Sequence, residues 1–373
     1  MTRIRALLAA LLAAVIFSPG VSEAGERWSP EKAAAWYAAR PWPVGCNFLP
    51  SSAINQLEMW QAESFDLATI DRELGWAEGL GFNTVRVFLH DLAWKQDGPT
   101  FLRRIERFLQ VADRHKIRVM FVLFDSCWDP DPTLGKQRDP KPGLHNSGWV
   151  QSPGRSSLKD PARLADLESY VKGVMNYFEA DERILAWDLF NEPDNTNRSS
   201  YGKLEPPDKV ELSLALLGKT YAWARDVDPT QPLTSAVWVG DWSPEKASPT
   251  ARVQLDQSDV ISFHDYSPLP KLKERVASLA KLNRPILCTE YMARPAGSTF
   301  DPALGYLREQ GIGAYNWGFV DGKSQTMYPW DSWQKPYAAE PPRWFHDIFH
   351  RDGTPYDASE VAYIRKLTGK TAP

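Results

Sequence analysis

Two stretches of the chain end an apolar run with a carboxylate. Residues 184–193 read ILAWDLFNEP, and Glu192 comes near the end of this stretch. Residues 285–291 read PILCTEY, a shorter apolar run that leads to Glu290. Both runs are typical of buried strands whose last residues open into a site. Two carboxyl groups placed in this way can cleave a glycosidic bond, because one can protonate the leaving oxygen while the other meets the sugar carbon.

The composition is that of a globular protein with no basic excess. Hydrophobic residues make up 43% and charged residues 24% of the 373 residues, and the formal net charge is -4. We therefore expect no nucleic-acid partner. The 16 Trp residues favour carbohydrate, since flat aromatic rings stack on sugar faces. The 6 His residues include no His-x-His pair, so we expect neither a metal centre nor another cofactor.

The first 24 residues are typical of an export signal. Two Arg residues precede an apolar run over residues 6–17, and small residues at positions 22 and 24 form a cleavage site. The run is too short to span a bilayer comfortably, so we expect cleavage and no membrane association afterwards. This pattern predicts a secreted or periplasmic protein, with residues 25–373 as one catalytic domain and, we expect, a monomer.

The three cysteines allow at most one disulfide. Cys46, Cys127 and Cys288 all lie in or at the end of expected strands. An exported protein can form a disulfide, but buried thiols are the simpler interpretation at these positions.

Strand and helix patterns alternate eight times along residues 25–373. Such alternation predicts parallel strands joined by crossover helices, closed into a single (β/α)8 TIM barrel. Long irregular segments at residues 125–159 and 320–342 are expected to be loops at the carboxyl-terminal face. The expected strands are 44–48, 83–89, 117–124, 184–193, 233–238, 260–263, 285–291 and 313–317. The expected helices are 31–40, 66–80, 100–116, 160–179, 207–227, 269–282, 302–310 and one around 343–350.

Polar and aromatic residues mark the carboxyl ends of almost all these strands. Catalytic groups of barrels lie at those ends, so the side chains should converge. The residues are Arg86, His90, Asp125, Asn191, Glu192, Trp238, His264, Tyr266, Glu290 and Trp317.

In kind and order, these residues make the chain resemble the clan A retaining β-glycoside hydrolases, and family 5 most closely. The resemblance covers nearly all of residues 25–373. It implies that Glu192, in the Asn-Glu-Pro of the fourth strand, is the acid/base and Glu290, on the seventh, the nucleophile. It also implies that the sugar subsite is lined by Arg86, Asn191, His264, Tyr266 and Trp317. One position departs from the family pattern: many members have a His after the third strand, where this chain reads Asp-Ser-Cys-Trp over residues 125–128.

Three further Trp residues are candidates for contact with sugar. Trp149 lies in the long loop after the third strand, Trp238 ends the fifth strand, and Trp330 lies in the loop after the eighth. For each of them, packing in the core is the alternative.

The proposed roles require the two carboxyl groups to differ in protonation state. Glu290 must be ionised, and a nearby Arg86 would keep its pKa low, while Tyr266 could orient it. Glu192 must carry a proton, and we expect the negative charge of Glu290 to raise its pKa. The two carboxyl groups should then lie about 5 to 5.5 Å apart, as in retaining enzymes.

The sequence leaves other functions open. A transglycosylase would use the same two carboxylates, with a sugar hydroxyl in place of water. A barrel that only binds carbohydrate would have little use for two carboxylates that repel each other. The substrate is expected to be a β-glucan, a mannan or a related oligo- or polysaccharide.

Overall fold

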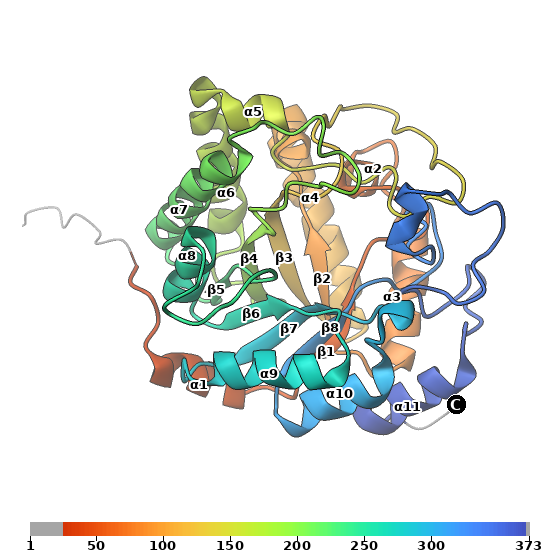
Figure 1. Cartoon of the computed structure of the whole chain (residues 1–373). Coiled ribbons are helices and arrows are strands. Elements are labelled where there is room, and N and C mark those ends of the chain that lie inside the picture. The colour runs from red at the N-terminus through yellow and green to blue at the C-terminus, as the bar shows by residue number, and fades with distance from the viewer. Residues whose placement is uncertain (1–24, 371–373) are drawn as a thin grey trace, which may run out of the picture.

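The computed structural model describes residues 25–370, so the export signal predicted at residues 1–24 lies outside the described part of the chain. Eight parallel strands form one sheet in the order β5-β4-β3-β2-β1-β8-β7-β6, with helices around its outside (Figure 1). The strands are β1 (Val44–Asn47), β2 (Thr84–Phe88), β3 (Arg118–Asp125), β4 (Ile184–Asn191), β5 (Leu233–Thr234), β6 (Ile261–His264), β7 (Ile286–Tyr291) and β8 (Gly313–Asn316). This nearly closed barrel confirms the predicted (β/α)8 fold.

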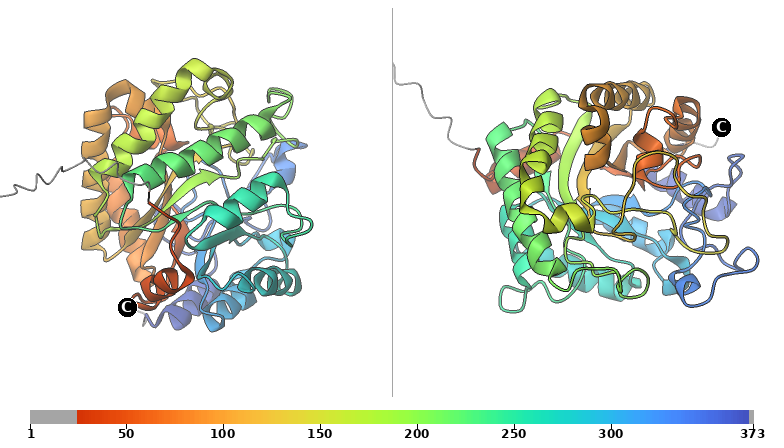
Figure 2. Two further views of the ribbon diagram at one scale, coloured as in Figure 1. Left: turned by 90° about the vertical axis from the view of Figure 1, so that its left-hand side faces the viewer. Right: turned by 90° about the horizontal axis from the view of Figure 1, so that it is seen from above.

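The outer helices pack an apolar stripe against the strands (Figure 2). In α6, the buried Leu167, Val171 and Val174 recur at helical spacing, and Tyr170 donates a hydrogen bond of 2.9 Å to the carbonyl of Leu123 on β3. The helices are α1 (Pro30–Ala38), α2 (Gln56–Trp60), α3 (Leu67–Gly79), α4 (Asp91–Arg114), α5 (Arg155–Lys159), α6 (Leu164–Tyr177), α7 (Lys209–Val227), α8 (Pro249–Gln257), α9 (Leu269–Ala280), α10 (Phe300–Glu309) and α11 (Ala358–Thr368). Short 3-10 turns are η1 (Pro161–Arg163), η2 (Arg294–Ala296) and η3 (Trp330–Trp333). No helix within residues 25–370 is long and apolar enough to cross a membrane.

The helix predicted around residues 343–350 is wrong. This segment has irregular backbone, and the last helix is α11, which begins after the capping residue Asp357. The buried guanidinium of Arg294 explains the difference, because it donates to the carbonyls of Trp344 (3.2 Å) and Asp347 (3.0 Å). Carbonyls satisfied by a side chain from another segment do not need helical partners.

Strand β5 is shorter than predicted. Its ladder with β4 ends at Thr234, whereas the sequence suggested a strand to residue 238. Side-chain hydrogen bonds replace the ladder: Ser235 donates to the carbonyl of Phe190 (2.7 Å), and Thr234 donates to that of Val260 (2.8 Å). A single bridge joins Val237, which lies after β5, to Phe263 on β6.

Apolar side chains fill the amino-terminal end of the barrel. Trp28 and Trp36, before and within α1, pack in one cluster with Met120, Leu287 and Tyr315 from three strands. Helix α1 thus closes this end of the barrel, and the polar residues lie towards the opposite end.

A buried ion pair lies where the side chains inside the barrel change from apolar to polar. Arg86 on β2 donates to Oδ2 of Asp188 on β4 from Nε (3.0 Å) and Nη2 (2.8 Å), and both side chains are inaccessible to solvent. A buried charge is tolerated only when it is paired and hydrogen-bonded. Arg86 therefore contributes to packing inside the barrel and also lies among the polar residues at the carboxyl-terminal ends of the strands.

Replacing Arg86 by Met should lower the free energy of unfolding by about 3–5 kcal/mol, because Asp188 would stay buried without its cation. Urea unfolding followed by Trp fluorescence measures the change. The control is Lys271→Met, which removes an exposed ion pair with Glu274 (2.6 Å) and should leave the unfolding midpoint in place. An Arg86→Met protein as stable as the parent would contradict this account.

Candidate active site

Arg86 lies at the centre of the polar residues at the barrel mouth. A guanidinium has five N–H donors, and Arg86 makes five hydrogen bonds. Beyond the two to Asp188, Nη1 donates to Asn47 Oδ1 and Glu290 Oε1, both at 2.8 Å. The fifth runs from Nη2 to Asn191 Oδ1 at 2.7 Å. One side chain therefore fixes residues from β1, β4 and β7 relative to each other.

The carboxylate of Glu290 is held on both oxygens. Arg86 contacts Oε1, and the hydroxyl of Tyr266 donates to Oε2 at 2.8 Å. The residue is only 5% exposed. A neighbouring cation and a hydroxyl donor both favour the ionised form of a carboxyl group, which is the form that the predicted nucleophile needs.

Glu192 follows directly after β4 in an uncommon backbone conformation. Its φ is 44°, in the left-handed region that residues with a Cβ rarely adopt. Such backbone outliers cluster at active sites when the surrounding structure holds them in place. Here the turn takes Glu192 off the line of the strand, and the side chain is 7% exposed.

The contacts of Glu192 differ from those of Glu290. Oε2 accepts hydrogen bonds from Asn195 Nδ2 (2.7 Å) and from the thiol of Cys127 (3.3 Å). Oε1 lies 2.9 Å from Nδ1 of His264, and the same nitrogen lies 3.6 Å from Oε2 of Glu290. Burial lowers the pKa of His264 to about 4, so its ring is neutral near pH 7. A neutral imidazole therefore lies between the two carboxyl groups.

The two carboxyl groups are close together. One oxygen of Glu192, one of Glu290 and a ring nitrogen of His264 all lie within 4.8 Å of one another. Retaining glycosidases have carboxyl groups about 5–5.5 Å apart, and inverting enzymes about 6.5–9.5 Å, to leave room for a water molecule. The separation of these two oxygens is nearer to the first range than to the second.

The pKa values differ from the expectation in cause and, for Glu290, in direction. Burial, rather than the charge of Glu290, is the main cause that raises the pKa of Glu192 to about 7, and the charge of Asp194 adds to it. Burial also raises the pKa of Glu290, whereas we expected Arg86 to hold it low. The charge of Arg86 lowers that pKa but does not outweigh burial. Exclusion of water from the barrel mouth is therefore the main influence on both groups.

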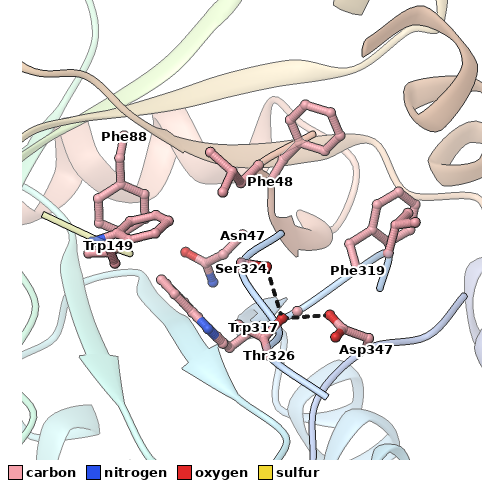
Figure 3. Close-up of a pocket in the computed structure, with 12 residues that line it drawn as sticks. Asn47, Phe48, Phe88, Trp149, Trp317, Phe319, Ser324, Thr326 and Asp347 are labelled. Carbon is pink, nitrogen blue, oxygen red and sulfur yellow. Dashed lines mark hydrogen bonds between the residues drawn. The ribbon is translucent and has the colours of Figure 1, made fainter. Parts of the chain in front are cut away.

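Trp317 and Trp149 form one aromatic cluster with Phe88 (Figure 3). The rings meet edge to face, with centroids 5.1 Å apart for Phe88 and Trp149, 5.7 Å for Phe88 and Trp317, and 5.6 Å for the two Trp residues. Trp317, after β8, keeps part of its surface exposed, as a floor for sugar would require. Trp149 is 3% exposed, and its Nε1 donates to Asp125 Oδ2 at 2.6 Å. Trp149 is thus packed as a fixed wall.

The other two predicted Trp residues lie around the rim. Trp330 is 37% exposed, and its ring meets Tyr266 edge to face at 5.1 Å. Trp238 is partly exposed and donates from Nε1 to Asp194 Oδ1 at 2.7 Å, two residues beyond Glu192. Six of the ten candidate residues thus form one connected network, and the four Trp residues lie around it; the six are Arg86, Asn191, Glu192, His264, Tyr266 and Glu290.

Sequence reasoning missed four side chains that hold this site: Asn47, Cys127, Asp188 and Asn195. Asn47 ends β1, so the rule that catalytic groups lie at strand ends could have found it. Asp188 was visible as a charge inside an apolar run. The contacts of Cys127 and Asn195 depend on the turn after β4, and nothing in the sequence pattern signals that turn.

Among residues 25–370, the only side-chain group spaced to suit a metal ion consists of Glu192, His264 and Glu290. Its oxygens are already used, because Asn195 donates to one carboxyl group and Tyr266 to the other. The guanidinium in contact with Glu290 would also repel a cation. This arrangement suits acid–base and nucleophilic chemistry better than metal binding.

The barrel fold and the two neighbouring carboxyl groups at its mouth are the features expected of a glycoside hydrolase. The family model described as Cellulase (glycosyl hydrolase family 5) matches residues 55–326, more than half of the chain. The chain therefore belongs to glycosyl hydrolase family 5 and is a glycoside hydrolase that acts on O-glycosyl bonds. No curated protein sequence matches it significantly.

Several solved structures share the fold at low sequence identity. An exo-β-1,4-mannosidase from Opitutaceae bacterium strain TAV5 is 20% identical with a TM-score of 0.59, covering 89% of this chain and 60% of its own. A β-1,4-mannanase from the sea hare Aplysia kurodai is 16% identical with a TM-score of 0.56, covering 74% and 88%. An endo-1,4-β-D-mannanase from Thermotoga petrophila is 13% identical with a TM-score of 0.54, covering 89% and 100%. This chain thus spans less than two thirds of the Opitutaceae enzyme.

Removing the amide of Asn195 should move the basic limb of the pH profile of kcat/KM upwards. Its N–H stabilises the ionised form of Glu192 and so lowers the pKa of that group. In Asn195→Ala the pKa of Glu192 should rise further. The basic limb should therefore move to higher pH by about one unit. Cys127→Ala should move the limb in the same direction by less, since a thiol is a weak donor. Asn176→Ala, on the exposed face of α6, is the control; a basic limb that stays in place or moves to lower pH in Asn195→Ala would be evidence against this role.

Proposed function

We propose that the protein is a retaining β-glycosidase in which Glu290 is the nucleophile and Glu192 the acid/base. The observation that supports this most strongly is the short distance between two carboxyl groups with unequal partners. Glu290 contacts a guanidinium, whereas Glu192 has only neutral donors and a pKa raised to about 7. A single site therefore offers an anion for attack and a proton for the leaving group.

In the first step, Glu290 forms an ester bond to the anomeric carbon while the bond from that carbon to the glycosidic oxygen breaks. The proton of Glu192 passes to this oxygen, and the remainder of the glycan leaves as an alcohol. Asn191 would meet the sugar 2-hydroxyl, and Trp317 would lie under the ring. Asp188 continues to balance the charge of Arg86 after Glu290 has become a neutral ester.

In the second step, Glu192 is the base. Its carboxylate takes a proton from water, the oxygen of that water bonds to the anomeric carbon, and the ester bond to Glu290 breaks. Two displacements on the same carbon return the original anomeric configuration. The negative charge on Glu290 is restored next to Arg86.

We infer that the substrate is a β-linked oligo- or polysaccharide such as a mannan, a β-glucan or a related glycan. The similar solved structures include mannanases and a mannosidase, which favours mannose-containing glycans. We also propose that residues 1–24 direct export to the periplasm or medium and are removed, and that the enzyme is a monomer. The mass of protein recovered after expression of the full chain tests the cleavage site.

Glu290→Gln should abolish sugar release, because an amide cannot form the ester intermediate. Sugar release from β-mannans, β-glucans, xylans and β-galactans, measured with the parent and the variant in parallel, tests this assignment and identifies the glycan. Full activity in Glu290→Gln would rule out Glu290 as the nucleophile.

Glu192→Ala should lose about 10²–10⁴-fold in kcat on natural glycans, whose leaving groups need a proton. Aryl β-glycosides with activated leaving groups should be affected less, and azide should restore turnover by attacking the ester in place of activated water. Equal losses on both kinds of substrate, without rescue by azide, would argue against the acid/base role.

A further inference from the structure

The two long loops, after β3 and after β8, lie next to each other at the right of Figure 1 and are joined by hydrogen bonds. We call residues 141–149 and 322–337 together the bridge. The backbone N–H of Asn146 donates to the carbonyl of Ser324 (2.9 Å), that of Tyr337 to the carbonyl of Gly143 (3.0 Å), and that of His145 to Ser332 Oγ (3.0 Å). These contacts connect the loop after β3 with the loop after β8.

Aromatic side chains extend the bridge to the loop after β4. Trp128 and Trp333 stack with centroids 5.4 Å apart, and Trp333 meets Tyr201 at 5.0 Å. Arg138 donates to the hydroxyl of Tyr201 (2.7 Å), and this hydroxyl donates to the carbonyl of Ser147 (2.9 Å). In the strand order, β8 and β4 are separated by β1, β2 and β3, so these contacts connect the loops at the two ends of that run of strands.

A small cavity lies between the bridge and strands β1 and β2. The cavity bounded by Trp149, Trp317, Phe88 and Asn47 has a volume of about 20 Å³ (Figure 3). Such a volume holds about one water molecule, whereas pockets for small ligands have roughly 300–1,000 Å³. This cavity is therefore too small to accept a second sugar ring.

Trp149 is held too firmly to act as a lid. Its indole N–H is bonded to Asp125, and its ring contacts both Phe88 and Trp317. Asp125 is fixed in turn by Asn191, whose Nδ2 donates to Oδ1 at 2.9 Å. The wall is therefore part of the same hydrogen-bond network as the catalytic carboxyl groups.

We propose that the enzyme acts at the non-reducing ends of its substrates and holds one sugar on the glycone side of the cleaved bond. This inference rests on the proposed function. The glycosidic oxygen must lie next to Glu192, so the leaving part of the glycan extends past the turn after β4 towards β5, where Trp238 is partly exposed. The glycone sugar then lies against the exposed part of Trp317, and a longer glycone would collide with the wall formed by Trp149.

Nitrophenyl β-glycosides of one and of two sugars test the proposal. The sugars are mannose, glucose, galactose and xylose, and the products are separated by chromatography. The parent enzyme should release nitrophenol directly from a monosaccharide glycoside. From the matching disaccharide glycoside it should first release one sugar, so nitrophenol should appear after a lag. Release of the intact disaccharide would overturn the proposal and leave the glycosidase function standing, whereas absence of any cleavage would overturn both.

Trp149→Ala should open the glycone side. The rate of intact disaccharide release relative to monosaccharide release should rise about tenfold or more, because a steric wall is removed. Trp36→Ala is the matched control, since this Trp is similarly buried but lies at the opposite end of the barrel. Trp333→Ala removes aromatic contacts of the bridge and leaves the contacts of Trp317 in place. Its product pattern tests the proposal if Trp149→Ala fails to fold. An unchanged product pattern in the folded variants would overturn the role of the wall.

Discussion

The guanidinium of Arg86 is the interaction on which the rest of the site depends. It is fully buried in the barrel, and its five hydrogen bonds reach Asn47, Asp188, Asn191 and Glu290. Burying such a charge is costly, and an apolar filling of the same volume is often at least as stable. The arrangement is therefore better explained by what it positions than by the stability it adds. In the proposed mechanism, its Asp188 partner lets the charge persist while Glu290 alternates between anion and ester.

The orientation of Asn191 carries this constraint to the second carboxyl group. Because its Oδ1 accepts from Arg86, its Nδ2 donates to Asp125 and to the sulfur of Cys127. The thiol of Cys127 in turn contacts Glu192. One continuous network thus sets the positions of both carboxyl groups and, through Asp125 and Trp149, the wall of the sugar site. Under the two proposals, catalysis and the limit on substrate length therefore depend on the same network.

The sequence was most informative where local pattern decides the outcome. Apolar runs that end in Glu192 or Glu290 predicted both their strands and their meeting point, since parallel strands of a barrel end at one face. It was least informative where a distant segment decides the outcome. Residues 343–350 have a helix-like composition but give their carbonyls to Arg294, and Asn195 reaches Glu192 only through a left-handed turn. The pKa of Glu192 was expected to depend on one neighbouring charge, whereas burial, a property of the whole fold, dominates it.

The central claim is that two carboxyl groups held within 4.8 Å of each other by this network perform a double displacement. Proton NMR during the first minutes of hydrolysis tests it most directly, because the anomeric configuration of the new product is visible before mutarotation. The account predicts that the β-anomer appears first and then equilibrates with the α-anomer. If the α-anomer appears first, a water molecule attacks the sugar directly, and the proposed role of Glu290 as nucleophile is wrong.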